Sequence, residues 1–155
     1  MELIQFKNEI WDSLRTITES MDTVFRPVNN AHGLTMMQIR LLAEIQQQRD
    51  NCTVGSLGKQ VSIACGNISS MCKRLEAEGL LHRTRSKRDE RVVHLQLTER
   101  GQQVLTAIDR ELTQRYAACF NQYPKEDFDM IINGLHQLNH MLLQMTEQRQ
   151  REELE

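Results

Sequence analysis

Two neighbouring segments of the chain carry side chains suited to binding a nucleic acid. Residues 66–74 read GNISSMCKR, and residues 82–91 read HRTRSKRDER. Asn and Ser side chains can hydrogen-bond to base edges in the major groove, whereas Lys and Arg bind phosphate. The second segment holds five basic and two acidic residues, although the whole chain has a formal net charge of -2. Attraction to nucleic acid must therefore come from a local patch and not from the chain as a whole.

The first segment is expected to form an amphipathic helix that ends at Gly79. Its apolar residues recur on one face: Ile68, Met71, Cys72 and Leu75. The opposite face and its flanks supply the candidate DNA-binding residues Asn67, Ser69, Ser70, Lys73 and Arg74. The small residues would let this recognition helix sit deep in the major groove. The alternative is a solvated surface helix with no ligand.

The second segment is expected to form a β-hairpin from two short strands, near residues 82–85 and 92–97. A basic hairpin beside a recognition helix can reach the neighbouring minor groove, where Arg is favoured. Asp89 is close enough in sequence to steady Arg91. The candidate DNA-binding residues of the hairpin are Arg83, Arg85, Lys87, Arg88 and Arg91. The alternative is a solvated turn, since most charge runs are solvated.

Short helices must position both segments. Thr35 and Gln38 form a capping box at the start of one helix, and Thr53 caps another that runs to about Gln60. Residues 62–64 would make a tight connection to the recognition helix. The inward residues are expected to be Ile39, Leu42, Ile45, Leu57 and Val61. Helix, helix, helix, strand, strand is the order of a winged helix-turn-helix.

Long amphipathic helices bracket this middle part. Thr98 caps a helix with Cys119 and Phe120 turned inward, and Pro124 opens the last helix. Heptad-like seams run through Leu14, Ile17 and Met21 and through Ile131, Leu135 and Leu142. A single subunit of this size cannot easily bury these seams. The sequence therefore predicts a homodimer held together by the terminal helices.

The predicted fold is mainly α with a small β-hairpin wing. Residues 1–155 form a single domain, in which residues 34–98 are the winged helix-turn-helix DNA-binding lobe. Residues 1–30 and 99–150 are the expected helical dimerisation region.

The ordered motifs carry a family resemblance. They are LTxxQ at 34–38, Leu57, RLExxGLLxR at 74–83, DxR at 89–91 and LTxxG at 97–101. Together they resemble the MarR family of bacterial transcriptional regulators. The resemblance implies a homodimeric repressor or activator that binds a palindromic operator in double-stranded DNA and is released by a ligand, a metal or an oxidant. By position it places Asn67, Ser69 and Ser70 in the base-reading part of the helix. It also makes Arg91 the wing arginine and Asp89 its supporting acid.

Cysteines and histidines raise the question of a sensor. Cys65 lies near the first turn of the recognition helix, where a helix N-terminus can lower a thiol pKa, so it is the candidate redox residue. Cys72 is most simply a small core hydrophobe. His136 and His140 have a spacing that can chelate zinc, but no Cys, Asp or Glu completes a motif, so no metal site is predicted. The sequence does not identify the small-molecule effector.

Composition and missing motifs exclude other classes. The chain has 155 residues, 39% of them hydrophobic, and no apolar run approaches the roughly 18 residues of a membrane span. Four cysteines at unrelated spacings favour a reducing compartment, so the predicted location is cytoplasmic. Phosphate-binding glycine loops and nucleophile elbows are missing, so neither an enzyme nor a cofactor is predicted. The alternatives are a thiol- or metal-responsive regulator of the same fold and a winged-helix protein-interaction module. A salt titration of binding to duplex DNA distinguishes a protein-interaction module from a DNA-binding protein.

Overall fold

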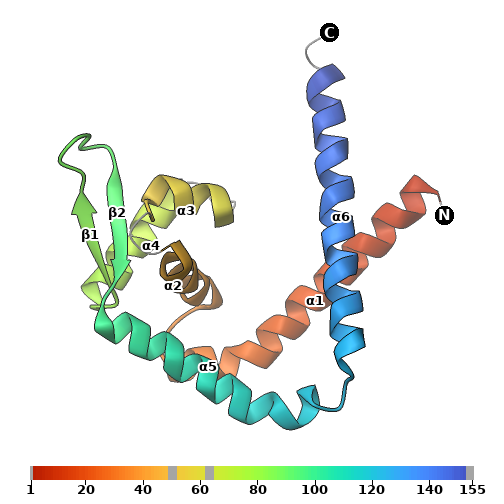
Figure 1. Ribbon diagram of the computed structural model, residues 1–155, viewed down its shortest axis with the longest axis horizontal. Helices are drawn as coiled ribbons and strands as arrows, with labels where there is room; N and C mark the ends of the chain where they lie inside the picture. The colour runs from red at the N-terminus through yellow and green to blue at the C-terminus, as the bar shows by residue number, and fades with distance from the viewer. Residues whose placement is uncertain (1, 49–51, 62–64, 153–155) are drawn as a thin grey trace. The chain divides into compact units, whose positions relative to one another are not determined.

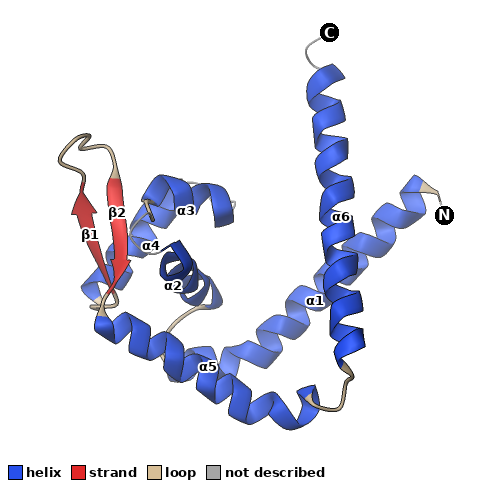
Figure 2. Cartoon of the chain, viewed as in Figure 1, coloured by secondary structure: helices blue, strands red, loops and turns tan. Residues whose placement is uncertain are grey.

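The computed structural model of the protein describes residues 2–48, 52–61 and 65–152. The described chain forms six helices and one two-stranded hairpin (Figure 1 and Figure 2). In chain order these are α1 (Leu3–Ala31), α2 (Met36–Gln48), α3 (Val54–Val61), α4 (Cys65–Ala77), β1 (Leu81–Arg85), β2 (Val93–Leu97), α5 (Glu99–Phe120) and α6 (Lys125–Glu152). The predicted fold, mainly helical with a small hairpin, is confirmed. The expected connection at residues 62–64 lies outside the described residues.

The chain divides into two compact units, residues 1–114 and residues 115–155. The first unit contains the hydrophobic core, to which α2, α3, α4, both strands and the first half of α5 contribute. Its fully or almost fully buried side chains include Leu41, Leu42, Ile45, Leu57, Ile68, Cys72, Leu75, Leu81, Leu95 and Ile108. Most of the predicted inward residues are therefore confirmed, although Ile39 is only partly buried against this core.

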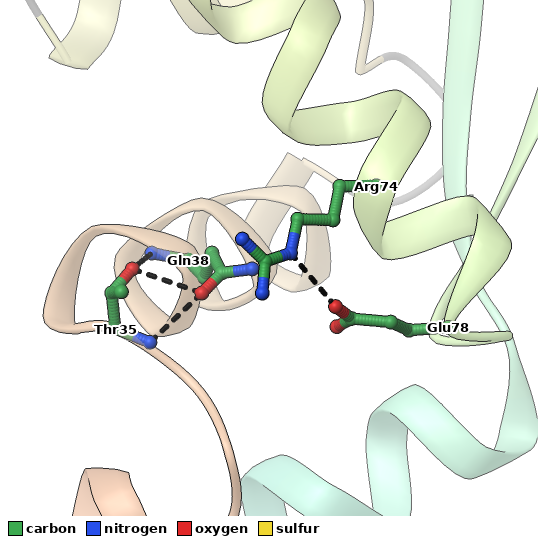
Figure 3. A network of polar contacts seen from close by, with 4 residues as sticks. All are labelled: Thr35, Gln38, Arg74 and Glu78. Atoms are coloured by element: carbon green, nitrogen blue, oxygen red, sulfur yellow. Dashed lines mark hydrogen bonds and ion pairs between the residues drawn. The ribbon is translucent and has the colours of Figure 1, made fainter.

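Reciprocal capping boxes start two of the helices in the first unit. At α2 the Gln38 backbone N–H donates to Thr35 Oγ1 at 3.2 Å, and the Thr35 N–H donates to Gln38 Oε1 at 2.9 Å (Figure 3). At α3 the Ser56 N–H donates to Thr53 Oγ1 and the Thr53 N–H donates to Ser56 Oγ, both at 3.0 Å. Each box satisfies backbone donors that have no partner within the helix.

The hairpin is antiparallel, with Leu81 opposite Leu97 and Arg83 opposite Leu95. A further short bridge joins Thr53 to His94, and the Leu95 N–H donates to the Cys52 carbonyl at 2.9 Å. The segment before α3 therefore forms a third backbone partner for the hairpin. It fixes β2 to the helical part of the first unit.

The terminal helices leave large apolar side chains in solvent. On α1 the side chains of Leu14, Ile17 and Met21 are 51%, 48% and 48% exposed. No described residue of α6 is buried, and Leu135 is 44% exposed. None of the described helices is both long enough and apolar enough to cross a membrane.

The prediction that Cys119 and Phe120 face inward is wrong for this chain. Both are exposed, because the last turns of α5 extend beyond Leu112, the last residue of that helix packed on the core of the first unit. In the second unit the Phe120 ring stacks on Phe128, with centroids 4.1 Å apart, and Tyr123 meets the same ring edge-on at 6.3 Å. The aromatic cluster fixes the corner between α5 and α6.

Candidate nucleic-acid interface

Helix α4, the recognition helix, is anchored by one apolar face. Ile68, Cys72 and Leu75 are each 0% exposed and belong to the core of the first unit. They recur every three or four residues, so they form a continuous stripe along the helix. The opposite face is thereby fixed toward solvent.

That solvent-facing side carries most of the residues predicted to read DNA. Asn67, Ser70, Lys73 and Arg74 are exposed, and Ser69 is half-buried on the flank. Arg74 Nε donates to Glu78 Oε1 at 3.0 Å along the last turn, with its side chain still 70% exposed (Figure 3). The face is polar, short-chained near the helix start and cationic one turn later. The side chain of Cys65, the candidate redox residue, lies outside the described residues.

The recognition helix ends in a Schellman motif. Gly79 has φ +73°, its N–H donates to the Glu76 carbonyl, and the Leu80 N–H donates to the Leu75 carbonyl, both at 2.9 Å. A left-handed residue at this position favours glycine, as the sequence predicts. The motif turns the chain from α4 into β1 within a few residues, so the recognition helix and the hairpin are held close together.

The wing, which comprises β1, β2 and its tip at residues 86–92, presents most of the predicted cations to solvent. Arg85, Lys87, Arg88 and Arg91 are all exposed. Lys73 and Arg74 of α4 are exposed as well, so the first unit has exposed cations on both the recognition helix and the wing.

The wing tip is organised by its own polar groups. Ser86 Oγ accepts the N–H of Arg88 at 3.2 Å, and Asp89 Oδ1 accepts the backbone N–H of Arg91 at 3.0 Å. The Ser86 N–H donates to the Val92 carbonyl at 2.9 Å and closes the tip. Asp89 therefore supports Arg91 through its backbone, which leaves the Arg91 guanidinium exposed.

The start of α5 fixes the foot of the wing. Thr98 Oγ1 donates to the Gly79 carbonyl at 2.7 Å and accepts the Gly101 N–H at 2.9 Å. The Thr98 N–H also donates to the Leu80 carbonyl at 3.1 Å. Thr98 thus caps α5, as predicted, and ties that helix to the corner between α4 and β1. In the sequence, Gly101 stood out only as the last residue of the LTxxG motif. In the structure it packs closely against this corner.

Arg83 is placed differently from the other wing cations. Its side chain is only 17% exposed, and its Nη1 lies 3.5 Å from Glu76 Oε2. Glu76 Oε1 also accepts the Arg83 backbone N–H at 3.1 Å. This placement favours a supporting role for Arg83 over direct contact with DNA. The sequence did not assign a role to Glu76, and the available signal was its place in the RLExxGLLxR motif, seven residues before Arg83.

Two of the cysteines are core residues. Cys52 and Cys72 are both 0% exposed, as predicted for Cys72. Burial raises the pKa of Cys52 to about 11, opposed by a hydrogen bond with Ser56. Burial also raises the pKa of Cys72 to about 11, opposed by the charge of Arg83. Both thiols are therefore protonated at neutral pH, and a protonated thiol is a poor nucleophile.

Within the described residues, the histidine pair of α6 has no third ligand group. His136 and His140 are exposed. Among the described residues, no group of three or more His, Cys, Asp or Glu side chains could hold a metal ion. The described part of the chain offers no metal centre to the recognition helix or the wing.

Comparison with known proteins matches this geometry. Residues 23–108 match the family described as transcriptional regulator SarA/Rot. The HTH-type transcriptional regulator FarR of Neisseria gonorrhoeae is 34% identical over 103 residues, which cover 64% of this chain and 68% of that protein. The organic hydroperoxide resistance transcriptional regulator of Bacillus subtilis is 30% identical over 98 residues, which cover 63% of this chain and 66% of that protein.

Solved structures show the same fold. The crystal structure of a mutant MarR from E. coli, complexed with operator DNA, superposes with a TM-score of 0.73. It is 18% identical and covers 89% of this chain and 99% of that chain.

The family match spans more than half of the chain and includes the recognition helix and the wing. The fold is therefore that of the MarR-type winged helix-turn-helix proteins, and the chain belongs to the SarA/Rot family of transcriptional regulators.

Proposed function

We propose that this protein binds a palindromic operator in double-stranded DNA as a homodimer and acts as a ligand-responsive repressor. In this proposal α4 enters the major groove and the wing enters the adjacent minor groove. The observation that carries it is the presence of exposed cations on two neighbouring elements of one unit, one of them a helix whose other face is packed in the core. A helix or a turn that only faces solvent would need neither the exposed cations on two elements nor the fixed orientation of the helix.

Specific roles follow from the exposure of each side chain. Asn67, Ser69 and Ser70 are the proposed base-reading residues, because their short polar side chains lie near the start of the helix. Lys73 and Arg74 are proposed to hold phosphate, one turn farther along. Arg85, Lys87, Arg88 and Arg91 are proposed to contact the minor groove and its phosphates.

The terminal helices are the proposed dimer interface. Apolar side chains on α1 and α6 that are 44–51% exposed, such as Leu14, Ile17 and Leu135, would be buried against a second copy. Burial of apolar area is the main favourable term in such an association. Two copies would present two recognition helices about 34 Å apart, one turn of DNA.

An effector would change the distance or the angle between the two recognition helices and thereby the fit to DNA. We assign the effector to the small-molecule class, and the protein to the cytoplasm, where its operator would be. An oxidant-responsive regulator is the second candidate, favoured by similarity to the organic hydroperoxide resistance regulator of Bacillus subtilis. That candidate is assigned to Cys65, which begins the recognition helix, since Cys52 and Cys72 are buried and protonated and Cys119 lies on α5.

The test is selection of bound duplexes from a random pool, followed by salt titration of the selected sequence. A DNA-binding function predicts an inverted repeat with half-sites one helical turn apart and a steep fall in affinity with salt. Light scattering at micromolar concentration should give the mass of two chains. A winged-helix module that binds protein would select no sequence, and a monomer would contradict the dimer.

A further inference from the structure

Glu76, in the last turn of the recognition helix, uses both carboxylate oxygens to hold one residue of the wing. Oε1 accepts the backbone N–H of Arg83 at 3.1 Å, and Oε2 lies 3.5 Å from Arg83 Nη1. The carboxylate therefore binds the strand through its backbone and through its side chain at once. Two contacts to the planar carboxylate of Glu76 restrict the orientation of Arg83 more than one contact would.

The backbone contact lies at the free edge of the hairpin. Arg83 is opposite Leu95, and the Leu95 N–H points away from β1 to the Cys52 carbonyl. In an antiparallel ladder, opposed residues whose N–H groups both point outward form a non-hydrogen-bonded pair. The segment at Cys52 thus holds the β2 side of the wing, and Glu76 holds the β1 side. The wing is fixed on both edges at the same level.

The arginine of this ion pair is more enclosed than the arginine of the Arg74–Glu78 pair on the same helix. The Arg83 side chain is 17% exposed, compared with 70% for Arg74 in its pair with Glu78. A negative charge near a helix C-terminus is disfavoured by the helix dipole. Glu76 is therefore in a position where it depends on a cation, and Arg83 supplies it.

We propose that the Glu76–Arg83 pair sets the angle of the wing relative to the recognition helix, so that DNA binding depends on both residues although neither reads DNA. Both are positioning residues. The inference rests on the proposed function, since it assumes that the helix and the wing contact the same duplex. It assigns Arg83 to the support of the wing, and it assigns contact with DNA to the four exposed wing cations.

Charge alone predicts the opposite outcome, which makes the inference easy to test. Removing an acid from a DNA-binding lobe weakens repulsion of phosphate, so electrostatics alone would tighten binding. If Glu76 positions the wing, its loss weakens binding instead. The sign of the effect decides between the two.

The experiment compares Glu76→Ala with Glu78→Ala on the full chain. The probe is a duplex of about 30 base pairs that the wild-type protein selects from a random pool. Glu78 is the matched control, because it lies two residues away in sequence and removes the same charge, but its partner Arg74 is on the exposed side of the helix. We expect Glu76→Ala to weaken binding about tenfold and to lower the salt slope by about one or two, as wing contacts to phosphate are lost. Glu78→Ala should bind equally or more tightly.

A double-mutant cycle shows whether the effect acts through the wing. In a background with Lys87→Gln and Arg88→Gln, the additional loss caused by Glu76→Ala should shrink to less than about twofold. Arg83→Lys, which keeps the charge but not the planar geometry, should fall between wild type and Arg83→Met. Thermal melts of every variant check that it is folded, and Arg83→Lys carries the test if Glu76→Ala is not.

Two results would overturn the inference. One is a Glu76→Ala protein that is folded and binds as tightly as the Glu78→Ala control. The other is an undiminished loss in the background with Lys87→Gln and Arg88→Gln. Failure of the wild-type protein to select any duplex is a different outcome, since it contradicts the proposed function itself.

Discussion

The α-carbon of Gly101 faces the carbonyl oxygen of Leu80 so closely that a β-carbon on residue 101 would stand 2.1 Å from that oxygen. The same carbonyl accepts the Thr98 N–H at 3.1 Å. The first turn of α5 therefore packs backbone to backbone against the start of the wing. No side chain other than hydrogen fits at residue 101 without moving one of the two segments.

Gly101→Ala should destabilise the fold. The new methyl group would force α5 away from Leu80, at a cost of about 1 to 3 kcal/mol in the free energy of unfolding. Gly134→Ala is the matched control, since nothing lies within 4 Å of a β-carbon at residue 134. That control should stabilise α6 by about 0.5 to 1 kcal/mol. Urea unfolding of the three proteins measures both effects, and equal stabilities for all three would show that the close packing is relieved without cost.

Arg88→Gln should weaken binding to the selected duplex. Arg88 is exposed at the wing tip, so its loss should remove the proposed phosphate contact and leave the fold unchanged. The slope of log K against log salt should fall by about 1. Lys125→Gln, at the start of α6 in the other unit, removes the same charge and should leave the slope as it is. An identical change in both variants would mean that only net charge matters.

Asn67→Ala should relax sequence specificity more than it reduces affinity for random DNA. A bidentate amide contact to adenine discriminates by about 1 to 3 kcal/mol against the wrong base pair. The measurement is competition between the selected duplex and variants changed at one position. Lys73→Ala is the comparison, because a phosphate contact should be lost equally on all sequences. If Asn67→Ala discriminates between the selected duplex and its variants as well as the wild type does, Asn67 is not a base-reading residue.

The buried thiols should make stability fall at high pH. The pKa of Cys72 is raised to about 11 in the folded chain, above its ordinary value of 9.0, so the folded state holds its proton more tightly than the unfolded state. This contribution to stability is complete below about pH 9 and is lost as the pH rises toward about 11. Cys72→Ala should therefore show a shallower decline in Tm across that range. Cys119→Ala, at an exposed position, should keep the wild-type decline.

Cys65→Ser tests the oxidant-responsive alternative. If Cys65 is the sensor, peroxide should release the wild-type protein from its duplex and leave the Ser variant bound, because a hydroxyl cannot form a sulfenic acid. Cys119→Ser is the control for a cysteine that is exposed but on another helix. Equal release of wild type and Cys65→Ser by peroxide would exclude Cys65 as the sensor. A wild-type protein that peroxide does not release would favour a small-molecule effector.

Local patterns predicted most of the fold because each element begins or ends on a residue with a specific backbone role. Thr35 with Gln38, Thr53 and Thr98 mark helix starts, and Gly79 marks a helix end. These signals act within a few residues, so the sequence carries them in readable form. The same holds for the alternating Val93, Leu95 and Leu97 of β2.

Features that depend on contacts distant in the sequence were not predictable. Periodicity placed Cys119 and Phe120 inward, but which turns of a long helix meet a core depends on where the other helices end. Charge counting grouped Arg83 with the other wing cations, but its direction depends on Glu76, seven residues earlier on another element. The seam residues of α1 and α6 were recognised as apolar, yet one chain contains nothing that identifies their partner surface.

The cations of the wing should also influence how the protein approaches DNA before the two are in contact. Residues 82–91 carry a net +3 while the chain totals -2, so the remaining residues carry -5. The wing is therefore a region of positive potential on a chain of net negative charge. A polyanion attracts this region and repels the acidic residues, so encounters that begin at the wing are favoured. Dissolved salt should therefore slow productive association as well as weaken the final complex.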